Sequence, residues 1–262
     1  MFGLFNHKKS APNTRFTVEK SVKFVQDASG QSAVSLEKVK QTGGVDLHKR
    51  TVAIGISLQK RNMAGIRAQV VVLLDHSVSM YADYISNKVQ DLTERFLAFG
   101  LQVDVDGEIP VIPFDFTVKP AVNVNLNNFS GVVQRDIFRQ NSMGSTNLAA
   151  GLESVREMAK LTDAPIFLAV VTDGEPDDKA AAKKVVCDLS RYPVFVKFLS
   201  VKKVTFLEQL DNLSNSERLL DNVNTKEYTD LSNVSDKQFA DDMTDEWDSW
   251  VALAHTAGIL TD

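Results

Sequence analysis

Two uninterrupted apolar segments constrain the fold of this chain most strongly, residues 70–74 (VVVLL) and residues 166–171 (IFLAVV). A strand covered on both faces needs apolar side chains on both faces, so such runs are typical of the central strands of a parallel sheet. Each run is followed by a polar loop and then by apolar residues at helical spacing. This alternation predicts an α/β fold, a doubly wound, mostly parallel sheet with helices on both faces.

Stripes of apolar residues at spacings of three and four predict the helices around this sheet. The stripes cover residues 85–96, 148–159, 181–189 and 239–254. Gly100 is expected to end the first of these helices. The last stripe predicts one long terminal helix, in which Trp247 and Trp250 belong to the core rather than to a binding surface. Further strands are expected over residues 110–116 and 194–199.

The N-terminal part of the chain has a different pattern. Residues 1–12 are expected to be flexible. Residues 13–62 contain an 11-residue repeat, VSLEK, VDLHK and ISLQK. Each copy would place two apolar side chains on one face of a short strand, so we expect a β-rich appendage that packs on a main domain of residues 63–262. A binding surface is the alternative interpretation of the repeat.

The composition excludes several classes of function. The net charge of -5 gives no positive field for a phosphate backbone, so nucleic acid is not an expected partner. Cys187 is the only cysteine and there are four histidines, which argues against an internal disulfide and a Cys/His zinc cluster. No apolar run approaches the roughly 18 residues of a transmembrane segment, and no secretion signal is recognisable. We therefore expect a cytoplasmic protein.

Oxygen-bearing side chains lie where ligands of such sheets bind, at the carboxyl ends of the strands. The first apolar run leads directly into the sequence DHSVS, Thr146 precedes the helical stripe at 148–159, and Asp173 follows the second apolar run. Small, hard oxygen donors suit Mg²⁺ or Mn²⁺ better than a soft metal. We expect a divalent metal site formed by Asp75, Ser77, Ser79, Thr146 and Asp173.

These residues resemble the metal-ion-dependent adhesion site (MIDAS) of the von Willebrand factor A (vWA) domain. That site is written as Asp-x-Ser-x-Ser, a Thr from a later loop and an Asp from another, and all five positions match. The resemblance implies that Ser77, Ser79 and often Thr146 ligate the metal directly, while Asp75 and Asp173 hold its waters. The implied ion is Mg²⁺, or alternatively Mn²⁺ or Ca²⁺.

Residues 68–81, 100–107 and 220–223 look like the TerF-type branch of this fold in the tellurium-resistance proteins. That family is bacterial and cytoplasmic and is associated with tellurite and stress-resistance gene sets. Its vWA module is treated as a metal-dependent interaction module. His76 and Val78 depart from the usual pattern, but neither occupies a ligand position.

Two functions are compatible with such a site. In a protein-interaction module, neutral hydroxyl ligands leave the metal electrophilic, and an acidic residue of a protein partner completes its coordination. The alternative is a metal-dependent phosphohydrolase or nucleotide-processing enzyme, which needs a second acid two residues after its nucleophilic aspartate. Ser77 stands at that position, and no Gly-rich phosphate loop or Ser/His/Asp nucleophile signature is present. The sequence therefore favours a binding module that is not an enzyme.

Simpler explanations exist for individual residues. Asp75 and Asp173, taken singly, could cap helices. His76 could be a base or a ligand, but strand alternation points it away from its neighbours, toward the core or a partner. The acidic stretch at 104–108 lacks the order of a calcium loop and fits a turn. Asp115 lies near the same edge as the site, where a turn explains it equally well.

Overall fold

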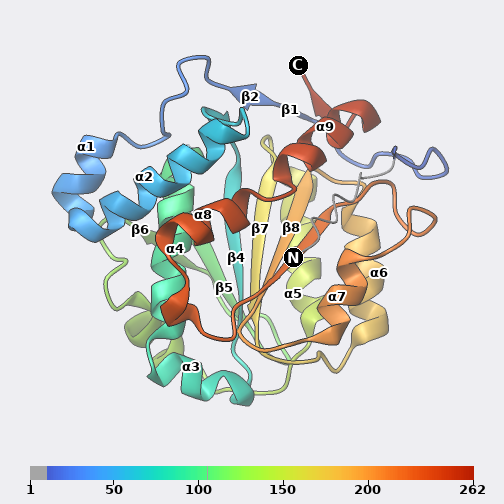
Figure 1. Ribbon diagram of the computed structural model, residues 1–262. Coiled ribbons are helices and arrows are strands. Elements are labelled where there is room, and N and C mark those ends of the chain that lie inside the picture. Colours follow the sequence, from blue (N-terminus) through green and yellow to red (C-terminus); the bar gives the residue numbers. More distant parts are fainter. Residues whose placement is uncertain (1–10, 105) are drawn as a thin grey trace, which may run out of the picture.

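A six-stranded sheet forms the centre of the molecule (Figure 1), and the computed structural model describes residues 11–104 and 106–262. The strands are β4 (Gln69–Asp75), β5 (Glu108–Phe114), β6 (Val122–Asn125), β7 (Ile166–Thr172), β8 (Val194–Ser200) and β9 (Val223–Glu227). Their order is β6-β5-β4-β7-β8-β9, parallel except that β5 and β6 are antiparallel. The predicted α/β, mostly parallel sheet is confirmed.

The two central strands are apolar because each contributes to two cores. Along β4, Val70, Val72 and Leu74 belong to one buried cluster, while Val71 and Leu73 belong to the other. Side chains of a strand alternate between the faces of a sheet, so helices on both faces bury every residue of the run. The same alternation holds along β7.

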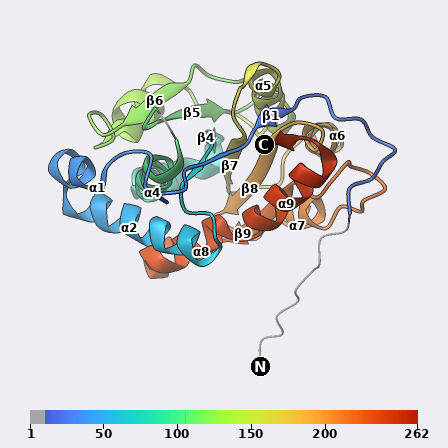
Figure 2. The ribbon, with the colours of Figure 1, turned by 90° about the horizontal axis from the view of Figure 1, so that it is seen from above.

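Helices cover both faces of this sheet (Figure 2). One face carries α2 (Gly44–Lys60), α4 (Lys88–Val103), α8 (Asp236–Thr244) and α9 (Trp247–Ala257). The other face carries α5 (Leu148–Leu161), α6 (Lys179–Leu189) and α7 (Thr205–Asp211). None of the helices in the described ranges is long and apolar enough to cross a bilayer.

Short elements complete the chain. The helical ones are α1 (Leu36–Lys38), α3 (Tyr81–Ile85), π-helical turns at Val39–Gly43 and Val133–Ile137, and 3-10 turns at Val78–Met80, Phe138–Gln140 and Leu231–Asn233. The extended ones are β1 (Val22–Lys23), parallel to β10 (Leu260–Thr261), and β2 (Val25–Gln26), antiparallel to β3 (Ile66–Arg67).

Two of the predicted helices are divided. Asn87, at φ 62°, separates α3 from α4, and Glu246, at φ 64°, separates α8 from α9. Gly100 lies inside α4 rather than at its end. The glycine allows close packing there, because an added Cβ would stand 2.5 Å from Cγ2 of Ile109. Trp247 and Trp250 are fully buried, which confirms that they belong to the core.

The prediction of a β-rich appendage is wrong for the repeat, whose second and third copies lie in α2. Eleven residues complete about three turns of an α-helix, so an 11-residue period aligns side chains on one side of a helix as well. Leu47 and Leu58 accordingly face the core, while Val45 and Ile56 are exposed. Of the expected strands, the two-residue β1 and β2 are present in residues 13–62.

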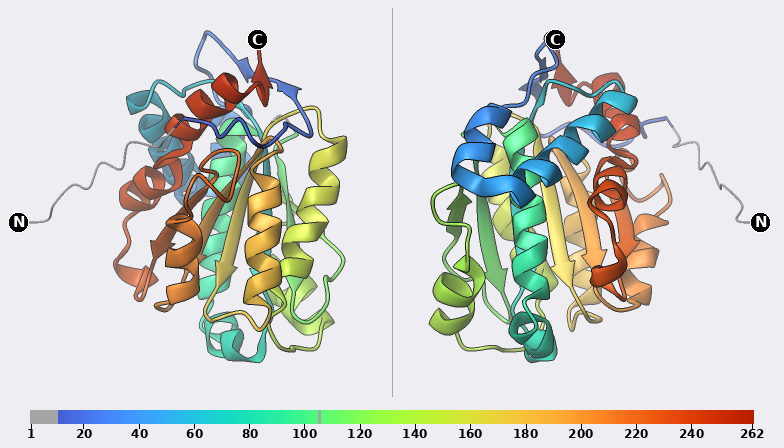
Figure 3. Two further views of the ribbon diagram at one scale, coloured as in Figure 1. Left: turned by 90° about the vertical axis from the view of Figure 1, so that its right-hand side faces the viewer. Right: turned by 60° about the vertical axis from the view of Figure 1, so that its left-hand side comes forward.

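The N-terminal residues pack against the main domain, as expected. Val22, Val39 and Ile54 belong to the same buried cluster as Phe96 and Trp250, and Figure 3 shows α2 lying across α4. A domain boundary near residue 62 stays a prediction. The expected flexible N-terminus lies outside the described residues, apart from its last two.

Candidate metal centre

The two predicted aspartates lie at the carboxyl ends of the two central strands. Asp75 is the last residue of β4, and Asp173 directly follows β7. The strands are parallel neighbours with Leu74 opposite Val171, so the two carboxylates emerge at the same level of the edge. This edge is at the lower end of Figure 1, where α3 lies.

A continuous chain of hydrogen bonds joins four of the five predicted residues. The Ser77 backbone N–H donates to Oδ1 of Asp75 at 2.8 Å. The Ser77 and Ser79 hydroxyls are 3.0 Å apart, and the Ser79 hydroxyl donates to Oδ1 of Asp173 at 2.6 Å. Asp75, Ser77, Ser79 and Asp173 therefore form one cluster of carboxylate and hydroxyl oxygens.

The loop that carries Thr146 lies alongside this cluster. Gly144 forms a parallel bridge with Ser77, and its carbonyl accepts from the Val78 N–H at 2.9 Å. The Thr146 carbonyl accepts from the Asp177 N–H at 3.0 Å. Within residues 11–104 and 106–262, no hydrogen bond joins the Thr146 hydroxyl to the cluster. The fold thus places Thr146 beside the site, and its side chain is nearly buried.

Asp75 is a buried carboxylate that is held by neutral groups. Its Oδ1 accepts from the Ser77 N–H at 2.8 Å and its Oδ2 from the Thr172 hydroxyl at 2.6 Å. Burial raises the pKa of Asp75 from 3.8 to about 6, against the lowering effect of these bonds, and the nearby charge of Asp173 adds to the rise. The hydrogen bonds therefore offset only part of the cost of an ionised Asp75.

The other buried carboxylates at this edge each have a lysine partner. The ion pairs are Asp173 with Lys202, Asp115 with Lys119 at 2.9 Å, and Asp83 with Lys88 at 3.0 Å. In the part of the chain that the structure describes, no ion pair is formed by Asp75. Asp75 is therefore the carboxylate of the site that has neutral hydrogen-bond donors and, among the described residues, no paired cation, and an added cation would balance its charge.

Three contributors to the site were missed in the sequence. Thr172 immediately precedes Asp173, so a strand-end hydroxyl was a signal that could have found it. Lys202 lies two residues after β8 at the same edge, and its ammonium group contacts Oδ2 of Asp173. Asp178 accepts from the N–H groups of Leu148 and Ala149, at 3.0 and 2.7 Å, and so holds the beginning of α5 next to Thr146.

The structure shows the surroundings of His76, Asp104 and Asp115, for which the sequence also offered simpler explanations. His76 is fully buried, with its ring 5.1 Å from that of Tyr84, and burial lowers its pKa, which agrees with a place in the core. Asp104 accepts from the N–H groups of Val70 and Asp106, at 2.9 and 3.1 Å, and serves as a turn residue far from the site. Asp115 stabilises a turn through the Thr117 N–H at 2.8 Å.

No group of three or more His, Cys, Asp or Glu side chains is arranged for a metal ion among the described residues. This agrees with a site that depends on serine and threonine hydroxyls for most of its donors. Hydroxyl and carboxylate oxygens are hard donors, so the residues present fit a hard divalent cation.

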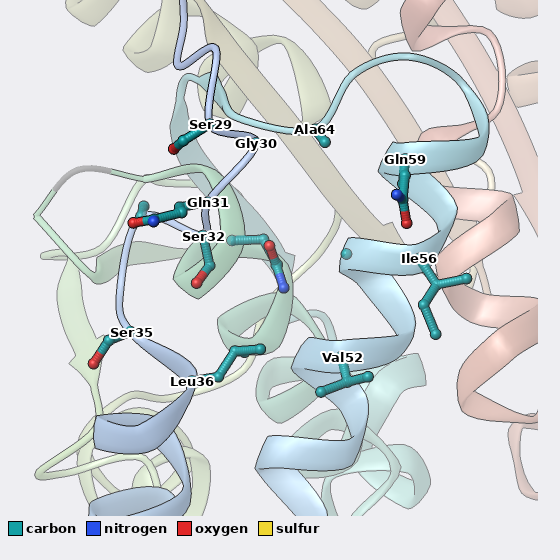
Figure 4. A pocket seen from close by; sticks show the side chains of 13 residues that line it. Ser29, Gly30, Gln31, Ser32, Ser35, Leu36, Val52, Ile56, Gln59 and Ala64 are labelled. Atoms are coloured by element: carbon teal, nitrogen blue, oxygen red, sulfur yellow. The ribbon is translucent and has the colours of Figure 1, made fainter.

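A cavity of about 680 Å³ lies elsewhere in the molecule. It is bounded by the segment before α1, by α2 and by the loop after α2, and Figure 4 shows Ser29, Ser32 and Gln59 around it. Every residue that lines it is neutral. The cavity therefore lacks the charged oxygen donors that gather at the strand edge.

A family model described as the vWA found in the TerF C terminus matches residues 67–260, well over half of the chain. The chain belongs to this vWA-TerF-like family. Uncharacterized protein YcbR of Bacillus subtilis (strain 168) is 28% identical over 226 residues, which cover 83% of this chain and 90% of that relative. The predicted vWA resemblance of the TerF type is confirmed.

Solved structures with a similar chain path include proximal thread matrix protein 1 from the mussel byssus, with 22% identity and a TM-score of 0.48 over 68% of this chain and 48% of that one. The same mussel protein has also been solved with a zinc-occupied MIDAS motif, at 20% identity, with a TM-score of 0.44 and coverage of 68% and 48%. Manganese-loaded Plasmodium vivax TRAP protein is 16% identical, with a TM-score of 0.41, over 62% of this chain and 69% of that one. This chain spans about half the length of the mussel protein. The family assignment rests on the family match alone.

Proposed function

We propose that this vWA domain is a metal-dependent protein-interaction module. Its ion would be held at Asp75, Ser77, Ser79, Thr146 and Asp173, with Mg²⁺ as the expected cation and Mn²⁺ or Ca²⁺ as alternatives. The bound cation would supply an electrophilic position that a carboxylate oxygen of a protein partner can occupy. A part in tellurium resistance or the stress response, and a cytoplasmic location, stay predictions from the family resemblance.

The observation that carries this proposal is the state of Asp75. It is fully buried, its partners Ser77 and Thr172 are neutral, and its pKa is raised to about 6. A buried charge without compensation is costly, and a protein retains one where a cation or a function balances it. The cluster of hydroxyls beside Asp75 provides the further oxygens that a hard cation requires.

Each residue has a defined part in the proposal. Ser77 and Ser79 offer neutral hydroxyl oxygens, and the hydrogen bond between them already brings these oxygens to 3.0 Å. Asp75 and Asp173 supply negative charge from the two central strands. Thr146 would join from a loop that is fixed by Gly144 and Asp177 rather than by the cluster itself.

The contacts of Asp75 also support a module that is not an enzyme. A nucleophilic aspartate needs an oxygen that is free to attack substrate. Both carboxylate oxygens of Asp75 accept short hydrogen bonds, from Ser77 and Thr172, and the side chain is buried. The alternative of a phosphohydrolase or nucleotide-processing enzyme gains no support from this geometry.

Calorimetric titration with Mg²⁺ and Mn²⁺ tests the proposal. We expect saturable binding of one ion to the full chain and at least about a ten-fold loss of affinity in a Ser77→Ala/Ser79→Ala double variant, because two ligands are removed. Ser86→Ala is the matched control, since the Ser86 hydroxyl lies in the same region and donates to the Asp83 carbonyl instead. Equal metal affinity in the wild type and the double variant would refute the assigned site.

A further inference from the structure

Exposed apolar side chains gather around the candidate metal centre. Five of the nine large hydrophobic side chains that are exposed in the described residues lie at this edge. They are Val78 (63% exposed), Tyr81 (55%), Ile85 (53%), Phe116 (56%) and Val118 (37%). We call these five residues the apolar rim. Single exposed hydrophobic residues are ordinary on protein surfaces, whereas a contiguous group marks an interaction surface.

Contacts in the structure show that the rim adjoins the site. Val78 stands between Ser77 and Ser79, and its N–H donates to the Gly144 carbonyl at 2.9 Å. The Phe116 ring packs against the same residue, because a Cβ added to Gly144 would stand 2.4 Å from Cδ1 of that ring. Val78 and Phe116 therefore both contact the loop that leads to Thr146.

The rim is held in place by its neighbours. The Lys119 ammonium lies 5.1 Å from the centre of the Phe116 ring, and Lys119 is itself paired with the buried Asp115. The Tyr81 ring is 5.7 Å from that of Phe138. Apolar side chains that are already ordered lose little freedom when a partner covers them, so this surface is prepared for binding.

The charges at the edge bear on the sign of the partner. Lys202 and Lys88 are each paired with an aspartate, Asp173 and Asp83, so the bound cation would set the sign of the charge that faces a partner. A cation there complements a carboxylate and disfavours a basic ligand. Water is expelled from the rim when apolar side chains cover it, and this gain is available only to a partner that is apolar next to its acidic residue.

We propose that the apolar rim and the metal centre together recognise an acidic residue flanked by apolar side chains on a protein partner. The inference rests on the proposed function, because the metal would take the carboxylate. It adds the apolar character of the residues that flank the partner's acidic residue, which the rim would bind. Specificity would thus come from the chain flanking the acid, since any carboxylate can approach a metal.

Three synthetic peptides test this proposal with the full chain, by fluorescence anisotropy in Mg²⁺ and in EDTA. One carries a central Glu flanked by Leu and Phe, the second a central Glu flanked by Ser, and the third a Gln in the apolar context. In Mg²⁺ we expect the first peptide to bind at least about ten-fold more tightly than the second, which corresponds to about 1.4 kcal/mol. Phe116→Ser and, separately, Ile85→Ser should remove most of that gain.

Leu161→Ser is the matched control, because Leu161 is exposed at the end of α5, away from the rim, and its loss should leave the gain unchanged. Calorimetry should show that Phe116→Ser still binds metal. Equal binding of the two Glu peptides, with both weaker in EDTA, would refute the role of the rim and leave the proposed function standing. Equal binding of the Glu and Gln peptides in Mg²⁺ and EDTA would refute the proposed function itself. Self-association of the chain that Phe116→Ser abolishes would assign the rim to a second copy and overturn the proposal.

Discussion

The Thr172 hydroxyl donates a 2.6 Å hydrogen bond to Oδ2 of Asp75, from the end of one central strand to the end of its neighbour. Both residues are buried, so water does not replace this bond when it is lost. The bond fixes the orientation of the carboxylate and partly offsets the cost of burying its charge.

Thr172→Val is therefore expected to destabilise the metal-free protein by about 1–3 kcal/mol at neutral pH, because a buried charged acceptor loses its donor. Urea denaturation measures the change. Thr93→Val is a suitable control, since the buried Thr93 hydroxyl donates to the Val89 carbonyl, within helix α4. A carbonyl that already takes a helical hydrogen bond loses less, so the control should cost clearly less than Thr172→Val. Similar losses in the two variants would contradict this account of Asp75.

The raised pKa of Asp75 makes stability depend on pH. The pKa of this carboxyl is about 6 in the folded protein, against 3.8 ordinarily, so the folded state holds a proton that the unfolded chain has already released between these values. The contribution of Asp75 to the stability of the metal-free protein is therefore largest at low pH and is lost as the pH rises through about 6.

An Asp75→Asn variant has no carboxyl group to ionise at this position, so it does not lose this stability as the pH rises. Relative to the wild type, it should gain up to about 3 kcal/mol of stability between about pH 4 and about pH 7 in EDTA. Denaturant unfolding of both proteins across this range checks the expectation, and contributions from other carboxyls cancel in the comparison. A stability difference between the two proteins that does not vary with pH would show that the charge of Asp75 is already compensated in the folded state.

Lys202 is expected to compete with the metal, because its ammonium group contacts Oδ2 of Asp173. Lys202→Ala should therefore bind Mg²⁺ or Mn²⁺ more tightly, by several-fold, since the buried Asp173 carboxylate loses its cationic partner and a metal ion would replace it. Lys203→Ala, an exposed neighbour, provides the control. If Lys202→Ala weakens metal binding in calorimetry, Lys202 supports the site rather than competing for it.

The predictable part of the fold followed from local pattern. Residues 70–74 and 166–171 could be placed in the sheet because a strand buried on both faces leaves no position for a polar side chain. The repeat in residues 34–60 was assigned to strands because each copy has two apolar residues at alternating positions. Its 11-residue period also equals about three turns of an α-helix, so a helix fits the repeat as well. The breaks at Asn87 and Glu246 could not be predicted, since no glycine, the usual residue at a positive φ, stands there.

The five expected site residues stand at one edge because each follows or precedes an element whose end could be located in the sequence. Four of them are joined by hydrogen bonds, and Thr146 is brought alongside. Lys202 was missed, because a pairing with Asp173, across 29 positions, depends on where β8 lies relative to β7. The pattern of the sequence thus predicted the oxygen donors of the site but not Lys202, whose ammonium group contacts one of them.

The helical form of the repeat predicts which of its residues carry stability. Leu47→Ala and Leu58→Ala should each cost about 2–5 kcal/mol, because both side chains are buried in the core shared with α4 and α8. Val45→Ala and Ile56→Ala should cost about 0.5 kcal/mol or less, since both residues are at least half exposed. Urea denaturation of the four variants makes the comparison. Equal losses for Val45→Ala and Leu47→Ala, and for Ile56→Ala and Leu58→Ala, would instead fit a strand that buries both apolar positions of each copy.

The most direct test of the central claim is the effect of divalent metal on thermal unfolding of the wild type, Asp75→Asn and Asp104→Asn. Asp104 is the matched control, since burial raises its pKa to about 6 as well, but it caps a turn at the opposite edge. We expect Mg²⁺ or Mn²⁺ to raise the Tm of the wild type and of Asp104→Asn, corresponding to about 2.7 kcal/mol at a hundred-fold excess over Kd, and to leave the Tm of Asp75→Asn unchanged. A wild-type Tm that does not respond to metal, or an equal response in Asp75→Asn, would contradict a metal centre at Asp75.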